Sequence, residues 1–305
     1  MMDSLLVFLA ILLSGIFRTS TPLLLVSLGE LITEKSGRIN LGLEGVLVMG
    51  ALAGFAASYW TGNAFWGVVF AAFIGFAMGG LHGWLCSYPR VSSIAVGIAL
   101  MILGTGLAFY LGKPFIQPQA PQLFALDLGF FISHMPFREA LKINVLFLLG
   151  IILVPFLSWF FAKTRWGLIV TMCGENGEAA HALGYNVATI RTLATATGGM
   201  LAGIGGSFLS LYYPGLWTES LSSGQGLLAV ALVIFSHWNA WRAMGASFLF
   251  GILGSLGAGL QSMGMSQGFH LFNAAPAFAG LIILWLTSHR FQKMRGRPAE
   301  LKVLT

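Results

Sequence analysis

The sequence has very little charge. Only 9% of its 305 residues are Asp, Glu, Lys or Arg, whereas 57% are hydrophobic. A soluble domain carries about 25% charged residues and could not bury so much apolar surface. The composition therefore excludes an ordinary soluble domain. It predicts an all-α, polytopic membrane protein in which residues 1–305 form one transmembrane domain.

Sequence motifs typical of metal-binding, redox and catalytic sites are also missing. Its two cysteines, Cys86 and Cys173, fit no metal-binding or redox spacing. The sequence has no HExxH pair, no serine elbow and no phosphate-cradling G-x-x-x-x-G-K-[ST] loop. We therefore predict no catalytic residue, no metal site and no cofactor here, so the chain is not expected to be an enzyme. The net charge of +6 is interpreted as favouring anionic lipid rather than nucleic acid.

Apolar runs separated by polar turns predict about nine to ten transmembrane helices. A helix needs about 20 residues to span a bilayer. Residues 5–32 are long for one helix and short for two, and Pro22 must break or kink them. Either a short helix over 4–17 precedes a half-helix over 21–32, or a single span is kinked, so the side of the N-terminus stays open. Further spans are expected at 43–60, 65–86, 91–111, 144–161, 187–211, 227–235, 244–260 and 274–286.

The distribution of basic residues predicts the orientation of these spans. Cytoplasmic loops of membrane proteins carry an excess of Lys and Arg. Placing the 163–187 loop inside puts twelve basic residues in the cytoplasm and leaves Lys113, Arg138 and Lys142 outside. We therefore expect a cytoplasmic loop over 163–187, an extracytoplasmic loop over 113–142 and a basic cytoplasmic tail over 287–305.

Glycine is abundant, with 40 residues, and several glycines recur at four-residue spacing inside the expected spans. Small residues at this spacing let two helix backbones approach closely in a membrane. Close packing within the bundle is the expected role of these glycines, and a glycine-lined path for a solute is the alternative. The pairs are Gly50 with Gly54, Gly75 with Gly79, Gly79 with Gly83, and Gly199 with Gly203.

The 163–187 loop contains a short helix whose two ends can be predicted. Asn176 is a good N-cap, and Glu178 lies in the first turn, where the helix dipole favours a negative charge. Gly184 is expected to end the helix, because glycine adopts the left-handed conformation of a C-cap at little energetic cost. A rod of roughly 12 Å cannot span a bilayer. It is either a surface helix on a cytoplasmic loop or a helix that docks into a groove of another protein.

Polar residues inside the apolar spans are candidates for a solute pathway. The segment SGRINLGLEG, residues 36–45, lies between a possible half-helix and a new helix, and such breaks are where transporters contact solutes. Its Asn40 and Glu44 either contact the solute or cap and pin the broken helix. An unpaired carboxyl group in hydrocarbon is costly. The candidate pathway residues are Glu30, Asn40, Glu44, Gln225 and Gln261.

Two of these segments carry a family resemblance. Glu178-Ala179-Ala180, three residues, and then Gly184 resembles the EAA-type coupling segment of bacterial ABC importer permeases. SGRINLGLEG is similar to the "G-x-IN-G-x-EG" signature of the subgroup that serves branched-chain amino acids, simple sugars and nucleosides. The motifs lie about 140 residues apart, so the resemblance covers essentially the whole chain. The surrounding sequence looks most like the smaller nucleoside-type permease subunit. The chain departs from the pattern at His181, where an Arg often stands.

The resemblance implies a permease subunit of an ATP-driven importer in the bacterial inner membrane, with a nucleoside or simple sugar as solute. A branched-chain amino acid permease is the alternative. A less favoured one is an ion-coupled transporter, in which Glu30 and Glu44 would titrate. The implied partners are a cytoplasmic ATPase holding ATP and Mg²⁺, a second permease subunit in a heterodimer, and an extracytoplasmic solute-binding protein. The residues implied to couple to the ATPase are Asn176, Glu178, Ala179, Ala180, Ala182, Leu183 and Gly184.

Overall fold

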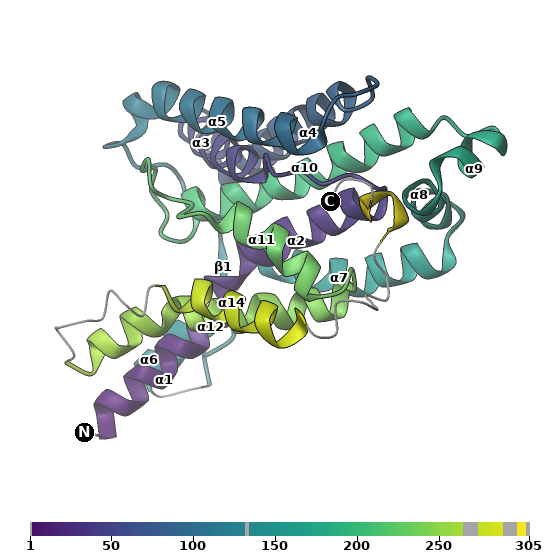
Figure 1. Ribbon diagram of the computed structural model, residues 1–305. Helices are drawn as coiled ribbons and strands as arrows, with labels where there is room; N and C mark the ends of the chain where they lie inside the picture. Colours follow the sequence, from purple (N-terminus) through teal and green to yellow (C-terminus); the bar gives the residue numbers. More distant parts are fainter. Residues whose placement is uncertain (1, 132–133, 265–273, 289–297, 303–305) are drawn as a thin grey trace.

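The computed structural model describes residues 2–131, 134–264, 274–288 and 298–302, and most of these residues are helical (Figure 1). Six described segments are long and apolar enough to cross a membrane. They are α1 with α2 (Met2–Phe17 and Ser20–Lys35), α3 (Leu43–Thr61), α4 (Ala64–Leu85), α5 (Ser93–Gly112), α7 (Val145–Lys163) and α12 (Ala240–Ser262). The predicted all-α polytopic membrane fold is confirmed.

Three further helices belong to the bundle. They are α10 (Val187–Leu211), α11 (Gln225–Phe235) and α14 (Ala275–Ser288). Counting α1 and α2 separately gives ten described bundle helices, but only six described segments are long and apolar enough to cross a membrane, fewer than the predicted nine to ten transmembrane helices. With 11 residues, α11 rises only about 16 Å, so it is a half-helix that cannot cross a bilayer alone.

The first long apolar stretch is two helices separated by Arg18 and Thr19, which was one of the two alternatives expected. Pro22 has no N–H to donate to the Arg18 carbonyl four residues earlier, so the helix is interrupted there. At the end of α1, the Thr21 hydroxyl donates to the Phe17 carbonyl at 2.5 Å, and Ser20 bonds the Ile16 carbonyl in the same way. The hydroxyl groups that follow the break therefore bond the last carbonyl groups of α1.

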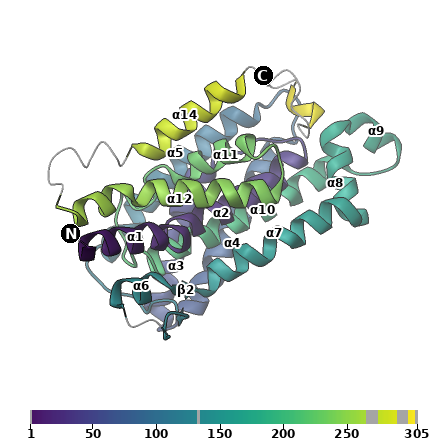
Figure 2. The same cartoon turned by 90° about the horizontal axis from the view of Figure 1, so that it is seen from below.

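The centre of the bundle is formed by α2 and α10. Nearly every residue of α2 is buried, and α10 packs against α2, α3 and α4 (Figures 1 and 2). A Cβ added at Gly50 would lie 2.6 Å from the Gly203 Cα, and one at Gly83 would lie 2.7 Å from the Thr192 Cα. The spaced glycines thus pack helix backbone against helix backbone, as predicted. The same is true of Gly54, Gly75, Gly79 and Gly199.

The two ends of the bundle carry different structures. At one end lie α8 (Arg165–Glu175), α9 (Gly177–Ala182) and the short η3 (Ala299–Lys302), and we call this the α9 end (Figure 1). The opposite end holds the start of α1, the helix α6 (Met135–Ala140) and an antiparallel ribbon of β1 (Ala125–Asp127) and β2 (Lys142–Asn144) (Figure 2). The described part of the tail therefore lies at the same end as the 163–187 loop.

Candidate functional site

The short helix α9 has the two ends that its sequence predicts. The Asn176 side chain accepts a hydrogen bond from the Ala179 N–H at 2.9 Å, which is the expected N-cap. Gly184 has a φ of +86° and donates its N–H to the His181 carbonyl at 2.9 Å. The helix covers six residues and is about 9 Å long, shorter than the expected rod of about 12 Å, because Leu183 already leaves the helical conformation.

One face of α9 is exposed and the other is attached to its own chain. Ala180 is completely buried and packs in a small cluster with Ile169 and Cys173 of α8. Burial raises the pKa of the Cys173 thiol, as expected for a packing residue rather than a reactive one. Leu183 has 67% of its surface exposed. The sequence grouped Ala180 with the partner-facing residues, but the structure places it on the inner face. The exposed members are Asn176, Glu178, Ala179, Ala182, Leu183 and Gly184.

Arg191 and Glu300 join α9 to the rest of the α9 end. The Glu300 carboxylate accepts the Gly177 N–H at 3.0 Å and lies 3.4 Å from the Arg191 guanidinium. Arg191 also donates to the Cys173 carbonyl at 2.6 Å and to the Ser36 carbonyl at 3.0 Å. One arginine of α10 thus links α8, the turn after α2 and the tail. No local pattern in the sequence predicted this junction.

Glu30 and Asn40 are brought together at the turn between α2 and α3. The Glu30 carboxylate accepts the Asn40 N–H at 2.8 Å, and the Asn40 side chain accepts the Gly42 N–H at 2.9 Å. Both residues are buried, with 0% and 1% of their surface exposed. They therefore hold the 36–42 turn against α2.

Glu44 is bound at the start of the half-helix α11. Its carboxylate accepts hydrogen bonds from the Ser222 hydroxyl at 2.5 Å, the Gly224 N–H at 3.1 Å and the Gly226 N–H at 2.7 Å. The N-cap position of α11 is Gly224, which has no side chain to accept these N–H groups. A carboxylate from α3 does so instead. Of the two roles weighed for Glu44, this geometry favours pinning a broken helix.

The two glutamine candidates lie apart. Gln225 lines a cavity of about 280 Å³ beside the α1–α2 break, together with Thr19 and Phe250. Gln261 is exposed near the end of α12, eleven residues beyond Phe250 and so about 16 Å further along the helix. The structure thus places Gln225 next to the Glu44 junction and Gln261 away from it.

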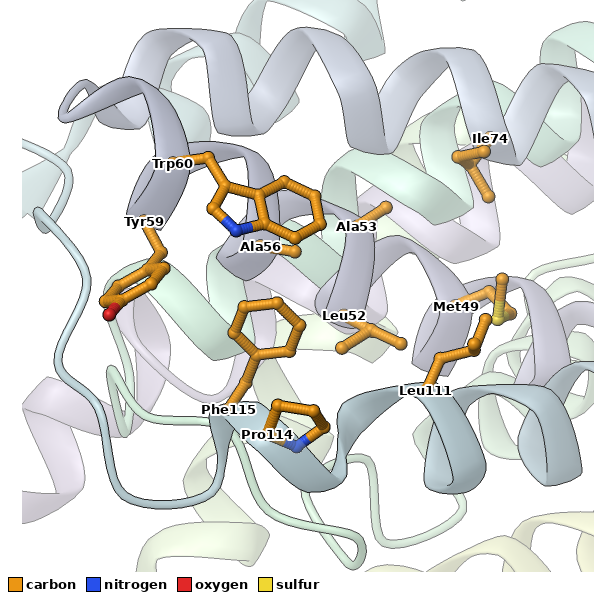
Figure 3. A pocket seen from close by; sticks show the side chains of 10 residues that line it. All are labelled: Met49, Leu52, Ala53, Ala56, Tyr59, Trp60, Ile74, Leu111, Pro114 and Phe115. Carbon is orange, nitrogen blue, oxygen red and sulfur yellow. The ribbon is translucent and has the colours of Figure 1, made fainter.

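A second cavity, which the sequence did not predict, opens between α3, α4 and α5. Its volume is about 560 Å³, and Tyr59, Trp60 and Phe115 line one end of it (Figure 3). The Phe115 ring packs edge-on against those of Tyr59 and Trp60, with ring centroids 5.9 and 5.4 Å apart. Tyrosine and tryptophan at helix ends are typical of the membrane–water interface. We therefore interpret these rings as an interfacial belt.

The chain is similar to a known protein family over most of its length. Residues 12–287 match the model of a family described as branched-chain amino acid transport system / permease component. That match covers all the described bundle helices from the middle of α1 to the end of α14, apart from one residue. It also includes both segments that carried the resemblance, residues 36–45 and 163–187.

Three relatives add detail. A putative glucose ABC transporter permease protein of Haloferax volcanii is 34% identical over 264 residues, which is 85% of this chain and 80% of that protein. A nucleoside ABC transporter permease protein of Lactococcus lactis subsp. cremoris is 31% identical over 261 residues, covering 81% and 82%. A second nucleoside ABC transporter permease protein of the same organism is 23% identical over 268 residues, covering 81% and 72%.

Proposed function

This chain belongs to the family of permease components of branched-chain amino acid transport systems, and on that premise we propose that its solute is a nucleoside or a simple sugar. The observation that carries the solute class is the similarity, at 34% and 31% identity, to permeases named for glucose and for nucleosides. The family description names branched-chain amino acids, so leucine is the solute against which the proposal is tested.

We further propose that the exposed face of α9 docks into a cytoplasmic ATPase, which holds ATP and Mg²⁺ and supplies the energy. Support comes from the attachment of α9 to its own chain. Ala180 packs it on α8, and Glu300 and Arg191 tie it to α10. A displacement of Leu183 or Ala179 by the ATPase would therefore also displace α10. This helix packs on α2, α3 and α4 at the centre of the bundle.

The expected direction of transport sets the orientation. We propose that the α9 end faces the cytoplasm of a bacterium and that the membrane is its inner membrane, as the distribution of basic residues favours. The described tail then lies in the cytoplasm. Because the start of α1 lies at the opposite end, the N-terminus is assigned to the extracytoplasmic side (Figure 1). The ribbon of β1 and β2, which closes the 113–142 loop, would meet a solute-binding protein there.

A second, unlike permease subunit is proposed to complete the pathway. The similarity to two different nucleoside permeases of one organism supports a heterodimer. Within this chain, Gln225 is the candidate solute contact, because it lines a cavity at the start of a half-helix and its amide oxygen has no hydrogen-bond partner among the described residues. Glu30, Asn40 and Glu44 are assigned to holding the broken helices in place around that cavity.

Uptake by reconstituted vesicles tests the solute class. Vesicles containing the permease pair and the ATPase, with ATP on the ATPase side, receive the solute-binding protein and labelled uridine, glucose or leucine. ATP-dependent uptake of uridine or glucose, but not of leucine, is expected. Uptake of leucine alone would contradict the solute class, and uptake driven by a pH gradient without ATP would contradict the importer mechanism. Gln225→Leu should reduce uptake, and Gln261→Leu is its matched control.

A further inference from the structure

A small polar pocket at the α9 end lies outside the coupling helix and the solute pathway. It has a volume of about 150 Å³ and is lined by residues of four separate segments: the turn after α2, the α4–α5 connection, the first turns of α10, and the tail. Its polar lining consists of Arg38, Ser93, Arg191 and Glu300. Two arginines and one carboxylate therefore border a space that could hold a small anion.

Arg38 is the unusual member of this pocket. The residue is 8% exposed, and its Nε is buried with no hydrogen-bond partner among the described residues. None of the ion pairs in the described part of the chain includes it. Burial and the nearby positive charge of Arg191 lower the pKa of Arg38 to about 10, so it remains charged near neutral pH. A buried guanidinium without a counter-charge is costly, and such groups are normally paired.

Ser93 is a second polar group in the pocket without a partner. It is 5% exposed, and its hydroxyl oxygen is buried with no hydrogen-bond partner among the described residues. Arg191, by contrast, already donates to two carbonyl groups and faces Glu300 at 3.4 Å. The groups without a hydrogen-bond partner are thus in the guanidinium of Arg38 and the hydroxyl of Ser93, and both can donate hydrogen bonds to an oxyanion.

We propose that this pocket binds a phosphate group, held by Arg38 and Ser93 with Arg191 alongside. The planar guanidinium of arginine matches phosphate oxygens in a bidentate geometry. The group could come from free inorganic phosphate or from the headgroup of an anionic phospholipid, because the pocket lies where the bundle helices end. This inference does not depend on the solute or on the ATPase.

The Glu300 carboxylate should compete with a bound phosphate group for the positive charge of the pocket. Its carboxylate lines the same pocket and partly neutralises Arg191. Removing its charge should therefore strengthen phosphate binding, whereas removing the charge of Arg38 should weaken it. Opposite effects from two variants in one pocket cannot be explained by general loss of folding.

The test uses the full-length protein in a maltoside detergent, which carries no phosphate group, with radiolabelled inorganic phosphate as the probe. Arg38→Gln should weaken phosphate binding about tenfold or more, since a charge-assisted hydrogen bond is lost. Ser93→Ala should also weaken it, and Glu300→Gln should strengthen it by up to about fivefold. Arg242→Gln, which removes an exposed arginine of α12, is the matched control and should leave binding unchanged.

A second arm separates the two sources of the phosphate group. Nanodiscs containing phosphatidylglycerol are compared with nanodiscs of phosphatidylcholine by native mass spectrometry and thermal unfolding. Retention of phosphatidylglycerol that depends on Arg38 and Ser93, without binding of free phosphate, assigns the pocket to a lipid headgroup. Arg38→Gln should raise the unfolding midpoint where no anion is present, because it removes an uncompensated charge. The proposal is overturned if neither probe binds, or if both bind Arg38→Gln and the wild type equally.

Discussion

The Glu44 carboxylate accepts the Gly226 N–H at 2.7 Å, although 182 residues separate them in the sequence. With the bonds from Gly224 and Ser222, this contact caps the half-helix α11 from a neighbouring helix. A helix that begins inside a bundle leaves N–H groups that water cannot satisfy. Glu44 therefore determines where α11 can begin, and with it the position of Gln225.

Replacing Glu44 by Gln should weaken this junction. An amide can still accept a hydrogen bond through its oxygen, but its NH₂ group cannot accept one from a backbone N–H. The loss should be about 1–3 kcal/mol and should appear as a lower thermal unfolding midpoint of the purified protein. Uptake should fall in parallel, because α11 is displaced.

Glu178→Gln serves as the control for stability: Glu178 is exposed in the first turn of α9, so removing its charge should lower the midpoint much less than Glu44→Gln does. If the Glu44→Gln protein has a normal unfolding midpoint but no uptake, Glu44 would instead be assigned to contacting the solute.

The packing of α3 against α10 predicts a contrast between two glycines. Gly50→Ala would place a Cβ 2.6 Å from the Gly203 Cα, so the helices must separate, at a cost of about 1–3 kcal/mol. Gly106, in the middle of α5, has no atom within 4 Å of an added Cβ. Gly106→Ala should stabilise the protein by up to about 1 kcal/mol through helix propensity. Thermal unfolding midpoints that shift in the same direction would contradict this account of the packing.

The two faces of α9 should respond differently to one substitution. Ala180→Glu buries a carboxylate against Ile169 and Cys173 and should lower stability by about 2 kcal/mol or more. Ala179→Glu, on the exposed face, should leave the unfolding midpoint unchanged while it disrupts binding of the ATPase. The pair is compared by thermal unfolding and by co-purification with the ATPase. Equal loss of stability in both variants would mean that α9 is packed differently.

The tail should restrain α9 through Glu300. Glu300→Gln weakens the bonds to Gly177 and Arg191, so backbone amides of residues 177–183 should exchange with solvent up to about tenfold faster. Hydrogen–deuterium exchange measures this directly. Glu219→Gln, which changes an exposed carboxylate in the segment that follows α10, is the control and should have no effect on these amides. Unchanged exchange in the Glu300 variant would remove the tail from the description of this junction.

Features that depend on neighbouring residues could be predicted from the sequence. The ends of α9 follow from Asn176 and Gly184, whose effects act over one turn. The close helix packing follows from glycine spacing, because the spacing alone determines which residues share a helix face. The expected spans of 43–60 and 65–86 agree with α3 and α4 to within one residue at each end.

Features that join distant segments could not be predicted. The cap of α11 is supplied by Glu44 rather than by a residue of its own turn, so no local signal marks it. For the same reason, the sequence does not predict that Gln225 lies beside the buried Glu44. Burial of Ala180 depends on how α9 folds back onto α8, and this was not visible in the EAA pattern.

The central claim is that α9 passes the force of ATP hydrolysis into the bundle, and Leu183→Glu tests it most directly. Leu183 is 67% exposed and contributes to no described core cluster, so the variant should insert and fold normally. The measurement is ATP-driven uptake by vesicles containing this variant, with unfolding midpoint and bound solute-binding protein checked in the same preparation. We predict normal folding and no ATP-driven uptake; uptake at the wild-type rate would contradict the account.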